Sequence, residues 1–141
     1  THLDWSVDNK WLQSNCGAYE LLFWDAHKCT QEVWPSKLAD VQWATWTCSL
    51  GWPVQGIWPR GSDGTDINAT ARSRKQTLLA TADDFGLLKI FNYPVVKPGA
   101  PFKKFIGHSA HVTNCCWLNE DKKIITTGGG DRSIMQWVVK F

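Results

Sequence analysis

The sequence predicts an all-β protein, a partial β-propeller of about three four-stranded blades in which the last blade is incomplete. Three observations predict this fold. A hairpin-like pattern occurs three times in 141 residues. Its copies lie roughly 40 to 50 residues apart where no insertion intervenes, as propeller blades do. Apolar residues nowhere follow the spacing of an amphipathic helix.

The repeated pattern has the features of a β-hairpin. Three segments align with one another without a gap: 11–24, 78–91 and 124–137. Each opens with an apolar pair, continues through small or polar residues to a turn containing Gly or Asp, and returns through apolar residues to an aromatic residue. We therefore expect the second and third strands of each blade here, ending at Trp24, Phe91 and Trp137.

Further strands flank each hairpin. First strands are predicted at 1–7, 67–73 and 113–119. Fourth strands are predicted at 29–34, or in a later piece of that segment, and at 101–107. The last unit reaches Phe141 before a fourth strand could begin.

The first interval between hairpins is longer than the second. Phe91 follows Trp24 by 67 residues, whereas Trp137 follows Phe91 by 46. The roughly twenty extra residues are assigned to an insert at about 41–64. A single propeller segment, 1–141, is thus expected to contain blade-like units at about 1–50, 65–106 and 107–141. Because the chain starts at Thr1 within strand-like sequence, we expect it to be a fragment of a longer protein.

Composition narrows the class of partner. Fifteen Lys and Arg against thirteen Asp and Glu give a net charge of +2, too small to favour nucleic acid or an anionic membrane. No apolar run approaches the roughly 20 residues that span a bilayer. The five cysteines include the adjacent Cys115 and Cys116 and show no disulfide spacing, so reduced thiols and a cytoplasmic location are expected.

Two motifs carry a resemblance to known families. Gly107-His108 is followed by Gln136-Trp137, with 28 positions from His108 to Gln136, and this resembles a WD40 repeat. The insert sequence "WTCSLGWPVQGIWP", followed by "GSDGTDIN", resembles the late blades of the echinoderm microtubule-associated protein-like (EMAP-like) family. This resemblance implies a segment of a larger tandem propeller. It also implies a non-enzymatic, microtubule-associated scaffold of the cytoskeleton with tubulin as partner.

The WD40 resemblance also implies a structural hydrogen-bond network. His108, Asp131 and Trp137 match its positions, while Gly129 stands where a Ser is expected, so the network is predicted to be incomplete. Pairing these groups internally would offset the cost of burying them. Since the motif contains no nucleophile near the His-Asp pair, the sequence predicts no enzyme.

Phosphate and calcium sites are weaker alternatives. Glycines 128–130 lack the Lys-Ser/Thr and the following helix of a phosphate-binding loop, so a turn explains them better. Segment 62–66 places two carboxylates beside glycines but lacks the downstream Glu of a calcium loop.

A zinc site is also weakly indicated. His108 and His111 precede Cys115 and Cys116, but adjacent residues of a strand point to opposite faces and cannot both bind one metal ion without distortion. The sequence therefore predicts no metal and no cofactor.

Exposed loops are the expected partner-binding surface. The candidates in the insert are Trp52, Trp58 and Arg60. In the second unit they are Arg72, Arg74 and Lys75, in the link between its first and second strands, and Lys103 and Lys104, in the connection before its fourth strand. Basic loops could meet acidic protein surfaces such as tubulin, and aromatic residues with Arg are typical interface anchors. Simple solvation of the loops, or an insert folded over a blade, are the alternatives. The alternative function is a general protein-interaction propeller in a signalling or scaffolding assembly.

Overall fold

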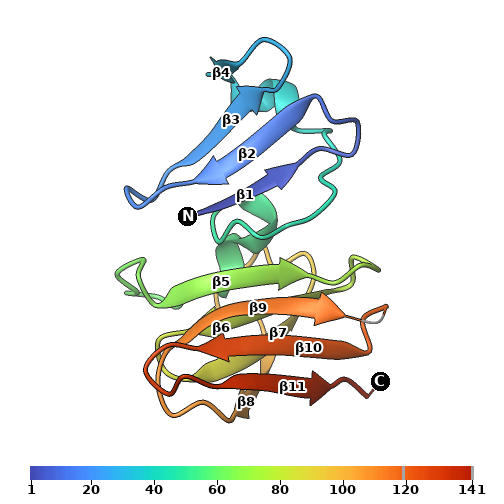
Figure 1. Ribbon diagram of the computed structural model, residues 1–141. Helices are drawn as coiled ribbons and strands as arrows, with labels where there is room; N and C mark the ends of the chain where they lie inside the picture. The colour runs from blue at the N-terminus through green and yellow to red at the C-terminus, as the bar shows by residue number, and fades with distance from the viewer. Residues whose placement is uncertain (119, 141) are drawn as a thin grey trace.

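The computed structural model describes residues 1–118 and 120–140 and forms three antiparallel sheets (Figure 1). Residue 119, the end of one predicted first strand, and residue 141 lie outside the described residues. In chain order, the strands of these sheets are β1(His2–Trp5), β2(Trp11–Asn15), β3(Leu21–Asp25), β4(Thr30–Glu32), β5(Ile67–Arg72), β6(Leu78–Asp83), β7(Leu87–Asn92), β8(Phe102–Ile106), β9(Val112–Leu118), β10(Lys123–Gly128) and β11(Ile134–Val138). Two short 3-10 helices, η1(Pro35–Leu38) and η2(Trp52–Ile57), lie between the first two sheets in sequence. The predicted all-β fold, with an incomplete last sheet, is confirmed.

Each sheet is a simple meander. The strand orders are β1-β2-β3-β4, β5-β6-β7-β8 and β11-β10-β9, so every strand pairs with its neighbour in sequence. Short turns make such local antiparallel pairing the easiest arrangement for the chain. In Figure 1 the sheet β9–β11 lies face to face with β5–β8, and the first sheet stands above β5. This is the stacking expected of consecutive blades.

The third hairpin is one residue longer than the other two. The strand pairs that place the aromatic residues are Leu12 with Trp24, Leu79 with Phe91, and Ile124 with Trp137. The paired residues are thus 12, 12 and 13 positions apart. The predicted gap-free alignment is therefore wrong by one residue, because the turn that contains the three glycines and Asp131 takes one more residue to reverse the chain.

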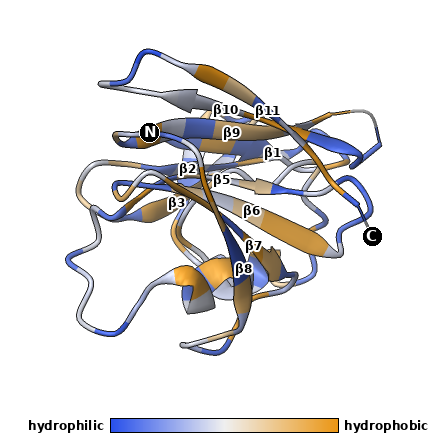
Figure 2. Ribbon diagram, turned by 90° about the horizontal axis from the view of Figure 1, so that it is seen from below, coloured by the Kyte–Doolittle hydropathy of each residue, from blue (hydrophilic) through white to orange (hydrophobic). Residues whose placement is uncertain are grey.

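Small side chains let the second and third sheets approach closely. Their shared core contains Ala69 and Ala71 on β5, and Ala80 and Ala82 on β6, all buried. Larger residues of β9 and β10 pack against this alanine surface, including Val112, Cys115 and Ile124. Figure 2 shows β6 as a largely apolar strand inside this stack. Alanines here permit dense packing without voids.

The insert connects the inner strands of the first two sheets. Residues 42–48, the bridging segment, bond on one side to the first sheet: Val7 N–H donates to Gln42 O at 2.8 Å, and Ala44 N–H donates to Trp5 O at 2.8 Å. On the other side, Arg72 N–H at the end of β5 donates to Trp46 O at 3.1 Å. The bridging segment therefore lies between two strand edges that would otherwise carry unpaired backbone groups.

Two tryptophans make the bridging segment part of the core. Trp43 and Trp46 are 8% and 5% exposed and pack with Leu79 and Phe91 of the second sheet. The η2 helix adds Val54 and Ile57 to the same cluster. The insert is thus folded into the molecule over most of its length.

One buried carboxylate fixes the bridging segment to β1. Asp4 is 1% exposed and accepts hydrogen bonds from Thr45 Oγ1 (2.5 Å), Thr47 N–H (2.9 Å), Cys48 N–H (3.2 Å) and Gln13 Nε2 (3.0 Å). Burial alone would raise the pKa of this carboxyl. The hydrogen bonds outweigh burial, so the pKa of Asp4 lies below its ordinary value and the group stays ionised.

Replacing Asp4 with Asn should destabilise the fold. Asp4→Asn puts an NH2 group against backbone donors, and we expect a loss of about 2 to 3 kcal/mol in the free energy of unfolding at pH 7. Because the folded pKa of Asp4 is depressed, its stabilising effect is present above about pH 4 and is lost as the pH falls below that. The difference between wild type and variant in urea unfolding should shrink in that acidic range. The exposed Asp40→Asn is the control and should change stability little; equal effects of both changes would contradict the role of Asp4.

Candidate functional site

A series of connected hydrogen bonds, called the relay below, links the segment after β8 to the third sheet through His108, Thr126, Asp131 and Trp137. His108 follows β8, Thr126 is on β10, Asp131 is in the β10–β11 turn and Trp137 is on β11. His108 Nδ1 lies 2.8 Å from Asp131 Oδ2, and His108 Nε2 lies 2.7 Å from Thr126 Oγ1. Trp137 Nε1 donates to the same Thr126 Oγ1 at 2.8 Å. With the proton on Nδ1, the indole donates to Thr126, the hydroxyl to His108, and the imidazole to Asp131, so each donor has an acceptor.

Thr126 is the member of this relay that sequence analysis missed. Gly129 was expected at the hydroxyl position, and that expectation is wrong: Gly129 lies in the turn beyond the end of β10, and the hydroxyl comes from Thr126, three residues earlier on that strand. With the strand pairs as reference, the residues equivalent to Thr126 are Ser14 and Thr81. Ser14 Oγ accepts from Trp24 Nε1 at 2.9 Å. In each of these hairpins an apolar residue, Ile124 or Leu12, pairs with the aromatic residue, and the hydroxyl residue follows that apolar residue by two positions. A Ser or Thr at this position is the sequence signal that would have identified Thr126.

Burial keeps this relay from acting on a substrate. The His108 side chain is fully covered and Thr126 is completely buried. Burial raises the pKa of Asp131, but hydrogen bonds from His108 and Ser133 outweigh it and hold the pKa at about 2. The relay therefore ties the connection after β8 to the β10–β11 hairpin and leaves no group free to react.

The second sheet does not form the equivalent hydrogen bonds among its described residues. Thr81 is completely buried, and its Oγ1 has no hydrogen-bond partner among the described residues. The residue at the Trp position is Phe91, which has no N–H to donate. Asp83, two residues further along β6, pairs with Lys89 Nζ at 2.7 Å.

The residues considered for a zinc site are separated by the fold. Cys115 is buried against Ala80, while its neighbour Cys116 is exposed on the other face of β9. His111 Nδ1 lies 2.8 Å from Asp84 Oδ1, and His108 belongs to the relay. Across residues 1–118 and 120–140, no group of three His, Cys, Asp or Glu side chains gathers as metal ligands do.

Two of the expected partner-binding residues are used inside the chain. Arg72 Nη2 donates to Trp43 O at 2.6 Å, and its guanidinium lies 5.6 Å from the centre of the Tyr93 ring. Trp58 Nε1 donates to Ser49 O at 2.9 Å, and its ring packs against the core cluster around the insert. Arg72 and Trp58 therefore help to hold the insert in place, and their role in binding a partner stays a prediction.

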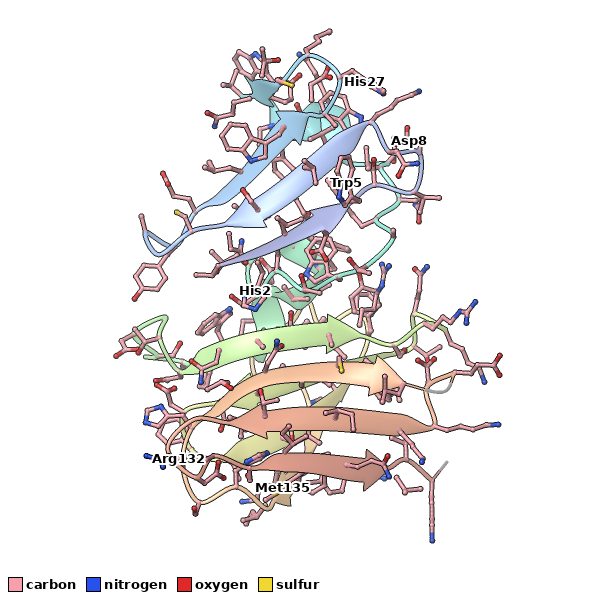
Figure 3. All side chains as sticks on the ribbon, viewed as in Figure 1. His2, Trp5, Asp8, His27, Arg132 and Met135 are labelled. Atoms are coloured by element: carbon pink, nitrogen blue, oxygen red, sulfur yellow. The ribbon has the colours of Figure 1, made fainter. Side chains whose placement is uncertain are left out.

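The remaining candidates stay exposed but do not form one patch. Arg74 and Lys75 are exposed in the turn after β5, where their backbone N–H groups donate to Asp121 at 2.7 and 2.9 Å. Arg60 is exposed in the loop before β5, at the other end of that strand. Trp52 is 66% exposed on η2. Figure 3 shows the long side chains that project from the turns at both ends of the sheets.

Lys103 and Lys104 are exposed on a strand instead of a loop. Both belong to β8, the last strand of the second sheet, where Lys103 opposes Ile90 and Lys104 opposes Lys89. Because neighbouring strand residues point to opposite faces, these two cations serve different surfaces.

Comparison with known proteins assigns the family. The family described as "Echinoderm microtubule-associated protein second beta-propeller" matches residues 1–139. The chain belongs to this family. The predicted resemblance to EMAP-like proteins is thereby confirmed.

Individual relatives support the same assignment. The chain is 55% identical over 139 residues to the 77 kDa echinoderm microtubule-associated protein of Lytechinus variegatus, covering 99% of the chain and 21% of that relative. It is 52% identical over 139 residues to echinoderm microtubule-associated protein-like 1 of Homo sapiens, covering 99% of the chain and 17% of the relative. The chain thus spans about a fifth of the length of these proteins.

A solved structure shares the fold of this EMAP-family segment. It is described as "Crystal Structure of Mitotic Checkpoint Complex", with a TM-score of 0.65 and 15% sequence identity over 97% of this chain and 48% of that one. At this identity the similarity concerns the fold alone. Within the described residues, no helix is both long and apolar enough to cross a membrane.

The two equivalent threonines should respond differently to the same substitution. Thr126→Val leaves the indole of Trp137 and one nitrogen of His108 without partners, and we expect a loss of about 1 to 3 kcal/mol in the free energy of unfolding. Thr81→Val removes a hydroxyl that has no hydrogen-bond partner among the residues that the structure describes, so its effect should be near zero or slightly stabilising. Urea unfolding of both variants measures the difference. Similar losses for the two would contradict the relay as a stabilising element.

Thiol accessibility should follow the positions of the cysteines. Burial raises the pKa of the Cys115 thiol to about 12 and that of the buried Cys48 thiol well above its ordinary value. The exposed Cys29 and Cys116 should therefore react with a thiol reagent in the native protein, whereas Cys48 and Cys115 should react only after unfolding. Mass spectrometry after brief alkylation identifies the modified residues. Rapid labelling of Cys48 or Cys115 in the native state would contradict this packing.

Proposed function

We propose that this chain contributes to a non-enzymatic scaffold that binds microtubules in the cytoplasm. The observation that carries the proposal is family membership over residues 1–139, together with relatives whose names describe them as microtubule-associated. The site geometry is compatible with a binding role, because the His-Asp pair is buried and its hydrogen bonds are spent within the chain.

The turn after β5 is the part of the candidate surface best suited to this role. Asp121, in the turn between β9 and β10, binds the backbone of Arg74 and Lys75 and is itself 2% exposed. The turn is thus held in one conformation by the neighbouring sheet, while both cationic side chains face solvent. Preorganised cations of this kind can contact an acidic protein surface at low entropic cost.

Charge reversal at this turn should weaken microtubule binding. In the full-length natural protein, Arg74→Glu with Lys75→Glu should reduce co-sedimentation with polymerised tubulin at low salt by about fivefold or more, because like charges then face an acidic surface. The control is Lys10→Glu with Lys28→Glu on the first sheet, where both side chains are exposed. Each double change alters the formal charge of the chain from +2 to −2, so a difference between them reports position and not net charge.

The measurement also separates the alternatives. Binding of the natural protein should fall between low and moderate salt, since exposed charges are screened over about 8 to 10 Å. Equal losses in the two double variants would remove the β5–β6 turn from the proposal. Absence of pelleting by the natural protein at low salt would overturn the microtubule proposal and favour a general protein-interaction propeller.

A further inference from the structure

Thr77 is an exposed hydroxyl residue that follows the cations of the β5–β6 turn. Arg74 and Lys75 stand three and two positions before it. No other Ser or Thr in the sequence has Lys or Arg at both of these positions. Protein kinases distinguish their substrates by such charge patterns, because acidic groups near the active site pair with cations that precede the acceptor hydroxyl. The turn thus carries a pattern that a kinase selective for basic sequences recognises.

Exposure separates Thr77 from two other hydroxyl residues that follow a cation. Ser73 comes directly after Arg72, and Thr126 follows Lys123 by three positions, but Ser73 is 2% exposed and Thr126 is completely buried. The Ser73 hydroxyl is also engaged, since its Oγ accepts from the Thr77 N–H at 3.2 Å. Thr77 is exposed, as are the three turn residues before it. Of these three hydroxyls, that of Thr77 is the one that an enzyme can reach.

Short-range hydrogen bonds and one buried carboxylate hold the turn closed. Gln76 N–H donates to Ser73 O at 2.9 Å, and Asp121 accepts from two further backbone N–H groups of the turn at 2.7 and 2.9 Å. Gln76 has a φ of 57°, in the left-handed region that is unfavourable for a residue with a side chain. Opening the turn therefore breaks these hydrogen bonds but also relieves an unfavourable backbone conformation.

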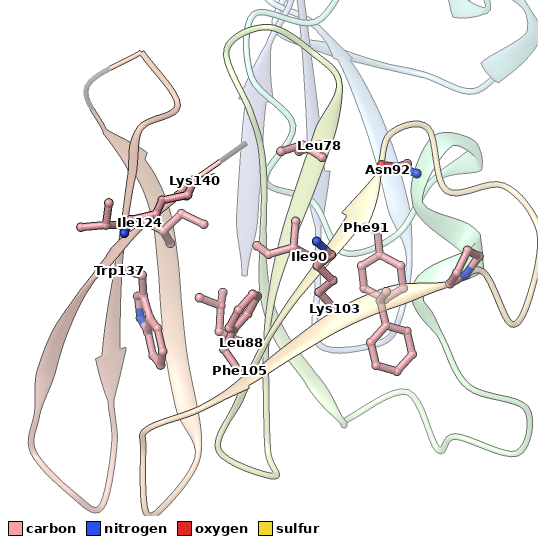
Figure 4. Close-up of a pocket in the computed structure, with 14 residues that line it drawn as sticks. Leu78, Leu88, Ile90, Phe91, Asn92, Lys103, Phe105, Ile124, Trp137 and Lys140 are labelled. Carbon is pink, nitrogen blue, oxygen red and sulfur yellow. The ribbon is translucent and has the colours of Figure 1, made fainter.

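The turn can open while the second sheet stays folded. β5 ends at Arg72 and β6 begins at Leu78, so the ladder between the two strands lies outside residues 74–77. Leu78 is half-buried and lines the pocket between the second and third sheets, where Figure 4 labels it. The fixed part of the chain thus starts directly after Thr77. Because a kinase binds its acceptor segment in an extended form, such a local opening is what presents Thr77 to it.

We propose that Thr77 is a phosphorylation site for a protein kinase that selects basic sequences. Thr77 Oγ1 forms a bond to the γ-phosphorus of ATP while the bond from that phosphorus to the oxygen of ADP breaks. The hydroxyl proton passes to a base of the kinase, and ADP leaves. The added phosphate carries a charge of about −1.5 to −2 at pH 7, which offsets the charges of Arg74 and Lys75.

The same modification regulates the surface that is proposed to contact microtubules. A phosphate on Thr77 changes the β5–β6 turn from cationic to nearly neutral, so the attraction to an acidic protein surface is lost. This regulatory role rests on the proposed function, whereas the modification of Thr77 itself does not.

The first experiment locates the phosphate by mass spectrometry. The full-length natural protein is incubated under native conditions with ATP and the catalytic subunit of cyclic AMP-dependent protein kinase, which selects basic sequences. Trypsin then releases the peptide 76–89, and its fragmentation distinguishes Thr77 from the buried Thr81. We expect phosphate on Thr77. A parallel incubation with casein kinase 2, which selects acidic sequences, should leave Thr77 unmodified.

Neutral substitutions test whether the two cations are recognised. Arg74→Gln with Lys75→Gln should slow phosphate incorporation at Thr77 by about tenfold or more, because acidic groups of the kinase lose their partners. The control is Lys10→Gln with Lys28→Gln on the first sheet, which makes the same change in net charge and should alter the rate less than about twofold. Circular dichroism checks that both double variants keep the β fold.

Each result decides the site. Phosphate on Thr77 of the native protein, at a rate that depends on Arg74 and Lys75, supports the proposal. Absence of phosphate at Thr77, or its incorporation only after unfolding, would overturn it. Equal rates in the two double variants would show that the cations of the turn are not recognised and would overturn it as well.

A second experiment tests the regulatory role. Co-sedimentation with polymerised tubulin at low salt is measured for the natural protein and for Thr77→Ala, before and after treatment with the kinase. Treatment should reduce pelleting of the natural protein by about fivefold and leave that of Thr77→Ala unchanged. Equal pelleting of the two treated proteins would overturn the regulatory role and leave the microtubule proposal intact. Absence of pelleting before treatment would overturn microtubule binding and its regulation together, while mass spectrometry still decides the site.

Discussion

The buried carboxylate of Asp4 is the constraint on which the arrangement of the first two sheets depends. The inner strands β1 and β5 do not pair with each other, because the bridging segment 42–48 lies between them. Asp4 holds this segment through hydroxyl and backbone donors of Thr45, Thr47 and Cys48. A charged acceptor with this many donors compensates for its own burial. Its position directs Trp43 and Trp46 into the core, which in turn places the second sheet.

The second and third sheets are joined by direct packing of their faces and by one buried carboxylate. Alanines on β5 and β6 allow β9 to pack closely, and Asp121 of the β9–β10 turn caps the backbone of the β5–β6 turn. Asn68 adds a further tie by donating to Val112 O at 3.0 Å. The two junctions thus differ in kind: the first is filled by an inserted segment, and the second is a direct contact of sheet faces. Both use buried carboxylates as acceptors for backbone N–H groups, which is how buried polar groups are normally satisfied.

The use of polar side chains within the fold also limits which groups can contact a partner. The histidine, aspartate and threonine of the relay, the guanidinium of Arg72 and the indole of Trp58 all form hydrogen bonds within the fold. The cationic side chains of the β5–β6 turn, Arg74 and Lys75, are exposed by contrast. A propeller segment built in this way offers rigid positions for contact, which is consistent with a family whose members are named for association with microtubules.

Local sequence alone determined the strands of this protein. Apolar runs around Gly- and Asp-containing turns were sufficient to place all three hairpins and their flanking strands, because antiparallel pairing across a short turn depends on neighbours in the chain. The family, too, could be identified from the insert sequence. Only the tertiary structure decided which polar and aromatic side chains are internal. Thr126 joins His108 across 18 positions, Arg72 reaches Trp43 across 29, and Asp4 reaches Thr47 across 43. The partners in such contacts are set by how the sheets stack, and no local pattern specifies them.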